Sequence, residues 1–146
     1  MSTIQVLVAL LSPIVAVIIA AWGFRRSRRT DMLGQFFDVY DKYLTEQVRK
    51  GRRIIHASAG GVGLSPGDAS AVGYTLAVMN SIAVCCESKY VDVDLIAKSM
   101  GRSFCSAMDA AAPIIDSMSA ERGFRPYGYA ERLAARLRDE YNVGNR

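Results

Sequence analysis

The sequence contains few of the residues that most catalytic and metal sites require. Its 146 residues include one histidine and three cysteines. The position three before His56 is Arg53, so the two Glu-x-x-His pairs of helical di-metal sites are excluded. Cys85, Cys86 and Cys105 lack the Cys-x-x-Cys spacing of zinc sites. We therefore predict no catalytic, cofactor-binding or metal-binding residues, no cofactor, and a protein that is not an enzyme.

Three further patterns each have a chemical and a structural interpretation. Cys86 and Cys105 could meet between facing helices, although small buried hydrophobic residues are the expectation. Residues 57–70 are glycine-rich, but they lack both a basic residue and the Gly-Lys-Ser/Thr ending of a phosphate loop, so we expect a connector. Asp109 and Asp116 lie seven residues apart, as a general acid and base could, and a solvated helix face is expected instead.

Charge is absent from residues 4–24 and then concentrated directly after them. These 21 residues would form a helix of roughly 31 Å, close to the ~30 Å hydrocarbon core of a bilayer. A cleaved secretory signal would carry its basic residues before the apolar run, and a buried helix of a soluble core is the other alternative. The expected membrane-interface residues are Trp22, Arg25, Arg26, Arg28 and Arg29.

Arginines that flank a span stay on the cytoplasmic side. We therefore expect a single-pass protein of the inner (plasma) membrane, with its N-terminus outside and its C-terminus in the cytoplasm. The predicted organisation is a transmembrane helix with its basic flank at residues 1–29, followed by a cytosolic domain at residues 30–146.

The net charge of +4 arises from the arginine cluster alone. Four of the 18 basic residues lie between positions 25 and 29, which leaves 14 basic and 14 acidic residues in the rest of the chain. We expect the cluster to meet anionic lipid headgroups, at about 1 kcal/mol per arginine, and not nucleic acid. A second basic group at residues 49–53 keeps a weaker nucleic-acid interpretation open, although a solvated helix end is expected there.

Residues 30–146 predict helices and no strands. Thr30 or Asp31 can cap a first helix whose apolar residues recur as far as Ile55, and whether the span runs straight into it is left open. Ser65, Pro66 and Asp68 predict the start of a second helix. Its expected apolar seam is Val72, Leu76, Met79, Ala83, Cys86 and Tyr90.

A third and a fourth helix complete the expected domain. The third has its apolar residues at Ile96, Met100, Phe104, Ala107, Ala111, Ile114 and Met118, and Pro113 should kink or divide it. The fourth has them at Ala130, Leu133, Leu137 and Tyr141. The predicted fold is therefore all-α, with one N-terminal transmembrane helix followed by a small antiparallel bundle of about four helices.

The order of several segments resembles a known family. These are the basic flank, "QFFDVYDKYL", an apolar helix ending in "CESKYVDVDLI", "FCSAMDAAAPII" and a closing "YGYAERLAARL". Together they are similar to the bacterial family catalogued as domain of unknown function 4760. The resemblance implies a membrane-tethered helical cytosolic domain, and it implies no activity and no catalytic residues.

The segment "QFFDVYDKYL" presents aromatic side chains over more than half of the helical wheel, so part of them should remain outside the bundle. The candidate partner contacts are Phe36, Phe37, Tyr40 and Tyr43, and we expect Phe37 or Tyr43, whichever faces outward, to be the anchor.

These features predict a membrane-anchored interaction module, acting as a scaffold, adaptor or regulatory subunit. Its expected partner is a second copy or another membrane protein. One alternative is a membrane-tethered ligand-binding or enzymatic domain with a site between Tyr90, Cys105 and carboxylates. Another is a holin-like membrane-permeabilising protein, against which the size of the structured domain argues.

Overall fold

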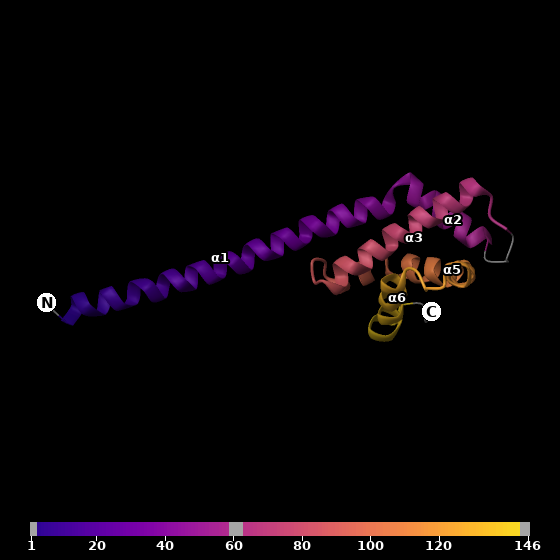
Figure 1. Cartoon of the computed structure of the whole chain (residues 1–146). Helices are drawn as coiled ribbons and strands as arrows, with labels where there is room; N and C mark the ends of the chain where they lie inside the picture. The colour runs from indigo at the N-terminus through magenta and orange to yellow at the C-terminus, as the bar shows by residue number, and fades with distance from the viewer. Residues whose placement is uncertain (1–2, 59–62, 144–146) are drawn as a thin grey trace. The chain divides into compact units, whose positions relative to one another are not determined.

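A computed structural model describes the backbone of residues 3–58 and 63–143, and the side chains of residues 15–28, 30–58 and 63–143. The described backbone forms six helices and no strand, which confirms the all-α prediction. The helices are α1 (Thr3–Leu44), α2 (Glu46–Ser58), α3 (Pro66–Glu87), α4 (Val93–Ser99), α5 (Gly101–Arg122) and α6 (Gly128–Tyr141) (Figure 1).

The chain divides into two compact units, Met1–Gly34 and Gln35–Arg146. We call them the N-terminal unit and the helical domain; the boundary predicted from the sequence was at residue 29. No helix begins at Thr30 or Asp31, which were predicted as caps, because α1 runs through both residues. The Thr30 hydroxyl donates to the Arg26 carbonyl oxygen at 3.2 Å, one turn earlier in the same helix. The expected span and the first helix of the domain therefore belong to one continuous helix.

Two breaks give the domain more helices than expected. At Thr45 the hydroxyl donates to the Lys42 carbonyl oxygen at 2.9 Å, which competes with the helical hydrogen bond and ends α1 before Ile55. At Met100 the backbone leaves the helical region, with φ −132° and ψ 0°, so α4 ends and α5 begins there. The expected single helix around Phe104 is therefore two helices.

Pro113 does not divide α5, which runs unbroken from Gly101 to Arg122. Proline deprives the carbonyl four residues earlier, that of Asp109, of its helical donor. Both residues are exposed, so water can satisfy that carbonyl.

The predicted start of α3 is confirmed in detail. The Ser65 hydroxyl oxygen accepts a hydrogen bond from the Asp68 backbone N–H at 3.2 Å, and the same hydroxyl donates to the Asp68 carboxylate at 2.7 Å. Pro66 occupies the first helical position, where no N–H is needed.

The core is formed by apolar residues at the predicted helical spacing. Five seam residues of α3 are buried, namely Val72, Leu76, Met79, Ala83 and Cys86. Helix α3 packs against α2 and α6, and α5 packs against the same two helices (Figure 1). Of the apolar positions expected in α6, Ala130, Leu133 and Leu137 are buried and Tyr141 is half-buried.

Two core predictions, Tyr90 and Met118, are wrong for a geometric reason. Tyr90 is exposed because α3 ends at Glu87 and the following turn places Val91 in the core instead. In α5, Ile115 is buried, Ile114 is half-buried and packs against the core, and Met118 is half-buried outside it. The predicted seam stepped three residues from Ala111 to Ile114 and then four to Met118. One helical turn is 3.6 residues, so position 115 lies closer to the direction of Ala111 than position 114 does, and the predicted positions moved away from the buried face.

Within the described side chains, α3 is the one helix that is long and apolar enough to cross a membrane. Some 44% of its apolar window is buried inside the domain, and the core helix of a soluble protein meets the same criterion. The span expected at residues 4–24 lies in α1, and its side chains up to residue 14 lie outside the described part of the chain. Those described in that segment, including Val17, Ile18 and Trp22, are exposed.

Candidate partner surface and cavity

The aromatic residues near the end of α1 divide between the core and the surface. Phe36 and Tyr43 are buried and Tyr40 is half-buried, whereas Phe37 is 58% exposed. The Phe36 ring stacks on Tyr40 with centroids 5.6 Å apart and meets Phe37 edge-on at 5.5 Å. Phe37, not Tyr43, is therefore the outward residue of the predicted pair.

Phe37 has an apolar neighbour on the same helix face. Leu44 follows seven residues later, which corresponds to two helical turns, and it is 40% exposed. Tyr40 lies beside this line and is half-buried. We call the exposed side formed by Phe37, Tyr40 and Leu44 the Phe37 surface.

Tyr43 is held inside the domain by a polar cluster that joins α1, α2 and α5. The Tyr43 and Ser103 hydroxyl oxygens lie 2.9 Å apart, and Arg52 donates from Nη1 to the Ser103 hydroxyl oxygen. The Arg52 guanidinium also lies 4.3 Å from the centroid of the Tyr43 ring, a cation–π contact. The Tyr43 ring also stacks on Phe104, with centroids 6.4 Å apart.

The electrostatics of this cluster favour structure over catalysis. Burial raises the pKa of Tyr43, although the hydrogen bond with Ser103 and the charge of Arg52 act against that rise. The raised pKa keeps the Tyr43 phenol protonated near neutral pH, so Tyr43 does not supply a base toward Ser103. The cluster fixes the end of α1 on the domain and thereby sets the direction of Phe37.

The sequence carried one signal of this cluster that our prediction missed. Val48, Gly51 and Ile55 form the buried face of α2, and Arg52 lies four residues after Val48 on the same face. An arginine within a buried stripe indicates a paired or stacked side chain. Its partner Ser103 lies 51 residues further along the chain, and nothing local identifies it.

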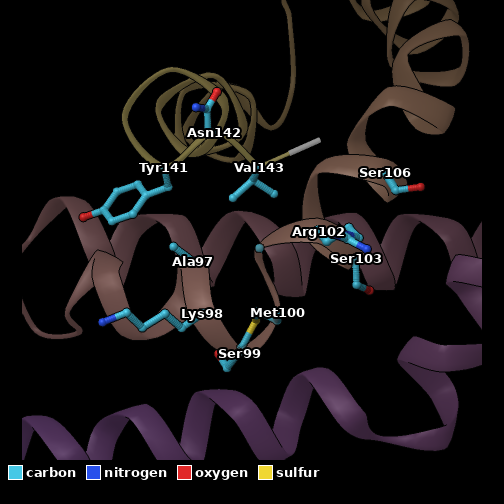
Figure 2. A pocket seen from close by; sticks show the side chains of 11 residues that line it. Ala97, Lys98, Ser99, Met100, Arg102, Ser103, Ser106, Tyr141, Asn142 and Val143 are labelled. Atoms are coloured by element: carbon cyan, nitrogen blue, oxygen red, sulfur yellow. The ribbon is translucent and has the colours of Figure 1, made fainter. Parts of the chain in front are cut away.

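A cavity of about 800 Å³ lies where α4, α5 and α6 meet (Figure 2). Its lining includes the cations Lys98 and Arg102 and the hydroxyl groups of Ser99, Ser103 and Ser106, and no histidine or carboxylate occurs among the described residues that line it. Lys98 is paired with Asp94 at 2.6 Å, a hydrogen bond that raises the pKa of Lys98. Figure 2 shows the Lys98 amine and the Arg102 guanidinium on opposite sides of the view, so the lining does not gather its charges.

The cysteines behave as small hydrophobic residues, as expected. All three are free thiols, with Cys86 and Cys105 buried and Cys85 half-buried. Burial raises the pKa of Cys86 to about 12 and also raises that of Cys105. The Cys105 thiol donates a weak hydrogen bond to the Ala134 carbonyl oxygen at 3.6 Å. Neither buried thiol is a reactive thiolate at neutral pH.

The carboxylates proposed as an acid and a base are held in separate ion pairs. Asp109 accepts from Arg138, and Asp116 accepts from Arg125 at 2.7 Å. Arg125 also binds Glu131 at 2.6 Å, and the two carboxylates raise the pKa of the guanidinium above its ordinary value. This is the solvated face that the sequence predicted.

The other residues singled out in the sequence differ in exposure. His56 is exposed near the end of α2. Of the residues named for the alternative site, Tyr90 is exposed and Cys105 is buried. No group of three or more metal-ligating residues occurs among the described side chains. Gly60 and Gly61 of the glycine-rich stretch lie outside the described residues.

The expected membrane-interface residues lie in the N-terminal unit. Trp22 is 67% exposed, and the Arg26 guanidinium lies 5.9 Å from the centroid of its ring. Arg25 and Arg28 are also exposed, and the side chain of Arg29 lies outside the described part of the chain. Their contact with a bilayer stays a prediction.

Three comparisons with known proteins complete these observations. Neither the curated proteins nor the solved structures contain a match to the chain. The model of one family, described as a domain of unknown function (DUF4760), matches residues 10–137. That match covers most of the chain, including all or part of every helix, and agrees with the resemblance found in the sequence. The chain therefore belongs to the DUF4760 family.

Proposed function

We propose that this protein is a membrane-anchored interaction module. Its N-terminal helix spans the inner (plasma) membrane once, with the N-terminus outside, and holds the helical domain in the cytoplasm. The domain acts as a scaffold, adaptor or regulatory subunit, and its contact with another protein in the same membrane is made through the Phe37 surface.

The observation that carries this proposal is the outward direction of Phe37. The Phe37 ring is 58% exposed, and the end of the helix that carries it is held to α5 by the contact between the Tyr43 and Ser103 hydroxyls. Aromatic residues on a rigid element supply binding hot spots, because little conformational entropy is lost when they are covered. A ring held in this way is ready to bind without rearrangement.

The N-terminal unit supports the membrane anchor. Its described apolar side chains, among them Val17, Ile18 and Trp22, are exposed and need an apolar environment. The four arginines that follow favour anionic headgroups and a cytoplasmic position. Anchoring would restrict the domain and its partner to two dimensions, which raises their effective concentration.

A photocrosslinking experiment tests the Phe37 surface. A photoreactive phenylalanine analogue replaces Phe37 in the full-length protein, and a matched control carries the analogue at Phe124, an aromatic residue of similar exposure at 60%. We expect protein adducts in native membranes from position 37 and only background from position 124. Equal yields at both positions, or adducts with lipid alone at position 37, would contradict the proposal.

Ligand binding is a second candidate, favoured by the cavity between α4, α5 and α6. Its volume suits a small molecule, and the Arg102 guanidinium with the serine hydroxyls suits an anionic one. Inorganic phosphate or a nucleotide that raises the melting temperature of the wild-type protein, but not of an Arg102→Ala variant, would favour this candidate over the interaction module.

A further inference from the structure

Arg52 carries a positive charge in the helical domain that no acidic side chain balances. The half-buried guanidinium donates to the Ser103 hydroxyl oxygen and lies over the Tyr43 ring, and its Nε atom is buried without a hydrogen-bond partner among the described residues. All 14 acidic side chains of the chain lie in the described part, and none of their ion pairs includes Arg52. A charge that is partly removed from water without a counter-ion is costly, so Arg52 lacks a negative partner.

Ser103 links Arg52 to the cavity between α4, α5 and α6. Ser103 belongs to the cavity lining, and Figure 2 shows it next to Arg102 near the start of α5. Arg102 is exposed, and it also takes part in none of the ion pairs of the described side chains. Four other arginines of the domain do bind carboxylates, namely Arg125, Arg132, Arg136 and Arg138. Ser103 therefore contacts one arginine without a counter-ion and follows a second one in the chain.

We propose that the cavity wall formed by Arg102 and Ser103 binds the phosphate group of a small molecule, and that this phosphate supplies the counter-charge for Arg52. The Arg102 guanidinium matches two phosphate oxygens in geometry and binds the phosphate directly. Arg52 is not among the described residues that line the cavity, so it acts through Ser103 as a positioning residue. The cavity volume of about 800 Å³ lies in the range of small-molecule sites, so the phosphate belongs to a larger molecule.

The hydrogen bonds of Ser103 connect this site to the end of α1. The Ser103 oxygen accepts from Arg52, and both of its lone pairs are used when the Tyr43 hydroxyl, 2.9 Å away, donates to it. The Ser103 proton is then free for a phosphate oxygen, and that donation strengthens the two hydrogen bonds that the serine oxygen accepts. A bound phosphate therefore tightens the contact that holds α1 on α5. By thermodynamic linkage, a weaker contact lowers the affinity for phosphate.

This inference rests on the ligand-binding candidate, which it deepens, and it is independent of the Phe37 surface. Phosphate that binds through Arg102 but not with the help of Arg52 would leave the ligand-binding candidate standing and overturn the inference. Photocrosslinking from position 37 decides separately whether the protein is an interaction module.

Calorimetric titration of the full-length protein in detergent with inorganic phosphate tests the site, with sodium chloride at equal ionic strength as the reference. Arg102→Ala and Arg52→Gln should each weaken phosphate binding by about tenfold, because each removes a charge that the phosphate needs. Arg52→Lys keeps the charge and should retain most of the affinity. Arg122→Ala removes an exposed arginine near the other end of α5 and is the matched control, with the affinity of the wild type.

A wild-type chain that does not bind phosphate would overturn the proposal. An Arg52→Gln variant that binds as tightly as the wild type would overturn the role of Arg52. Weakening by Arg122→Ala to the same extent as by Arg102→Ala would show that the phosphate responds to net charge and not to this cavity.

Hydrogen exchange separates the positioning role from a loss of fold. Phosphate should slow the amide exchange of residues 36–44 severalfold in the wild type, because it tightens the contact at Tyr43. Arg102→Ala should match the wild type without phosphate and show no slowing with it. Tyr43→Phe keeps the ring but removes the hydroxyl, so phosphate should no longer slow exchange there. Equal slowing in Tyr43→Phe and wild type would overturn the coupling.

A lipid headgroup offers the same phosphate chemistry, and a second arm of the exchange experiment distinguishes the two sources. The wild type is compared in phospholipid-free detergent with inorganic phosphate and in phosphatidylglycerol nanodiscs without it. Slowing by inorganic phosphate in detergent supports a soluble molecule. Slowing that occurs in the nanodiscs alone would assign the site to a lipid and overturn the small-molecule proposal.

Discussion

The two units of the chain use the same apolar residue types in opposite environments. In the N-terminal unit, Val17, Ile18 and Trp22 are more than 60% exposed. In the helical domain, Val72 and Ile96 are completely buried. The domain thus satisfies its apolar side chains through its own core, whereas those of the N-terminal unit need an environment that the unit itself does not supply.

The two units also differ in whether their basic residues are paired with acidic ones. In the helical domain, basic residues of α6 form ion pairs with acidic residues of other helices, such as Arg132 with Glu87 and Arg138 with Asp109. In the N-terminal unit, four arginines occur within five positions without an acidic residue among them. The described ion pairs of α6 thus join helices within the domain, whereas the arginine cluster of the N-terminal unit has no acidic residue inside it.

The largest expected effect is the loss of a core aromatic ring. Phe104→Ala should lower the free energy of unfolding of the helical domain by about 3–5 kcal/mol, because a buried ring is replaced by a cavity. Trp22→Ala, the matched control from the N-terminal unit, should leave that value unchanged. Chemical denaturation followed by circular dichroism measures both variants. A comparable loss in Trp22→Ala would show that the units share one core.

The next effect concerns the close packing of α2 on α3. A Cβ atom at Gly51 would lie 1.9 Å from the Thr75 hydroxyl oxygen and 2.7 Å from the Ala71 carbonyl oxygen. Gly51→Ala should therefore cost about 1–3 kcal/mol through overpacking.

Gly73→Ala is the control for that substitution. A Cβ atom there has no neighbour within 4 Å, so the higher helix propensity of alanine should stabilise α3 by up to about 1 kcal/mol. Melting temperatures that shift in the same direction for both variants would contradict this packing.

A smaller effect is expected from the polar cluster. Ser103→Ala removes the shared partner of Tyr43 and Arg52 and should lower the free energy of unfolding by about 1–2 kcal/mol. Ser106→Ala, an exposed serine one turn later in α5, is the control and should have almost no effect. Denaturant titration checks both. A neutral Ser103→Ala would mean that the cluster does not hold α1 in place.

The smallest effect at neutral pH concerns the buried thiol of Cys86. Its pKa is about 12 in the folded chain against an ordinary value of 9.0, so the folded state keeps a proton that the unfolded state releases. Stability should therefore be independent of this group below pH 9 and decline between pH 9 and 12, by at most about 1.4 kcal/mol per pH unit. Denaturation across this range, compared between wild type and Cys86→Ala, isolates the contribution. An identical slope in both would contradict the assignment.

The sequence predicted the parts of the fold that local rules decide. The start of α3 follows from Ser65, Pro66 and Asp68, and its seam follows from helical periodicity. The breaks at Thr45 and Met100 were not predicted, because neither residue is a strong helix breaker and packing decides where each helix turns. Tyr90 was misplaced because the end of α3 was set three residues too late.

For the candidate site, too, the sequence predicted what local pattern decides and missed what a long-range contact decides. The excess of aromatic residues in "QFFDVYDKYL" predicted that one of them would face outward, and Phe37 does. Which one faces outward depends on Ser103, 60 residues after Tyr43 in the chain. A contact of that separation has no local signature, so the choice between Phe37 and Tyr43 needed the structure.

The membrane anchor and its orientation are tested most directly by the activity of alkaline phosphatase fused after Arg146 in a bacterial host. This reporter is active only outside the cytoplasm. We predict an inactive fusion for the native chain, and activity in a fraction of molecules when the four arginines are moved ahead of Ile4, because basic residues determine which end of a span stays inside. Activity of the native fusion would contradict the orientation, and inactivity of both fusions would contradict the membrane span itself.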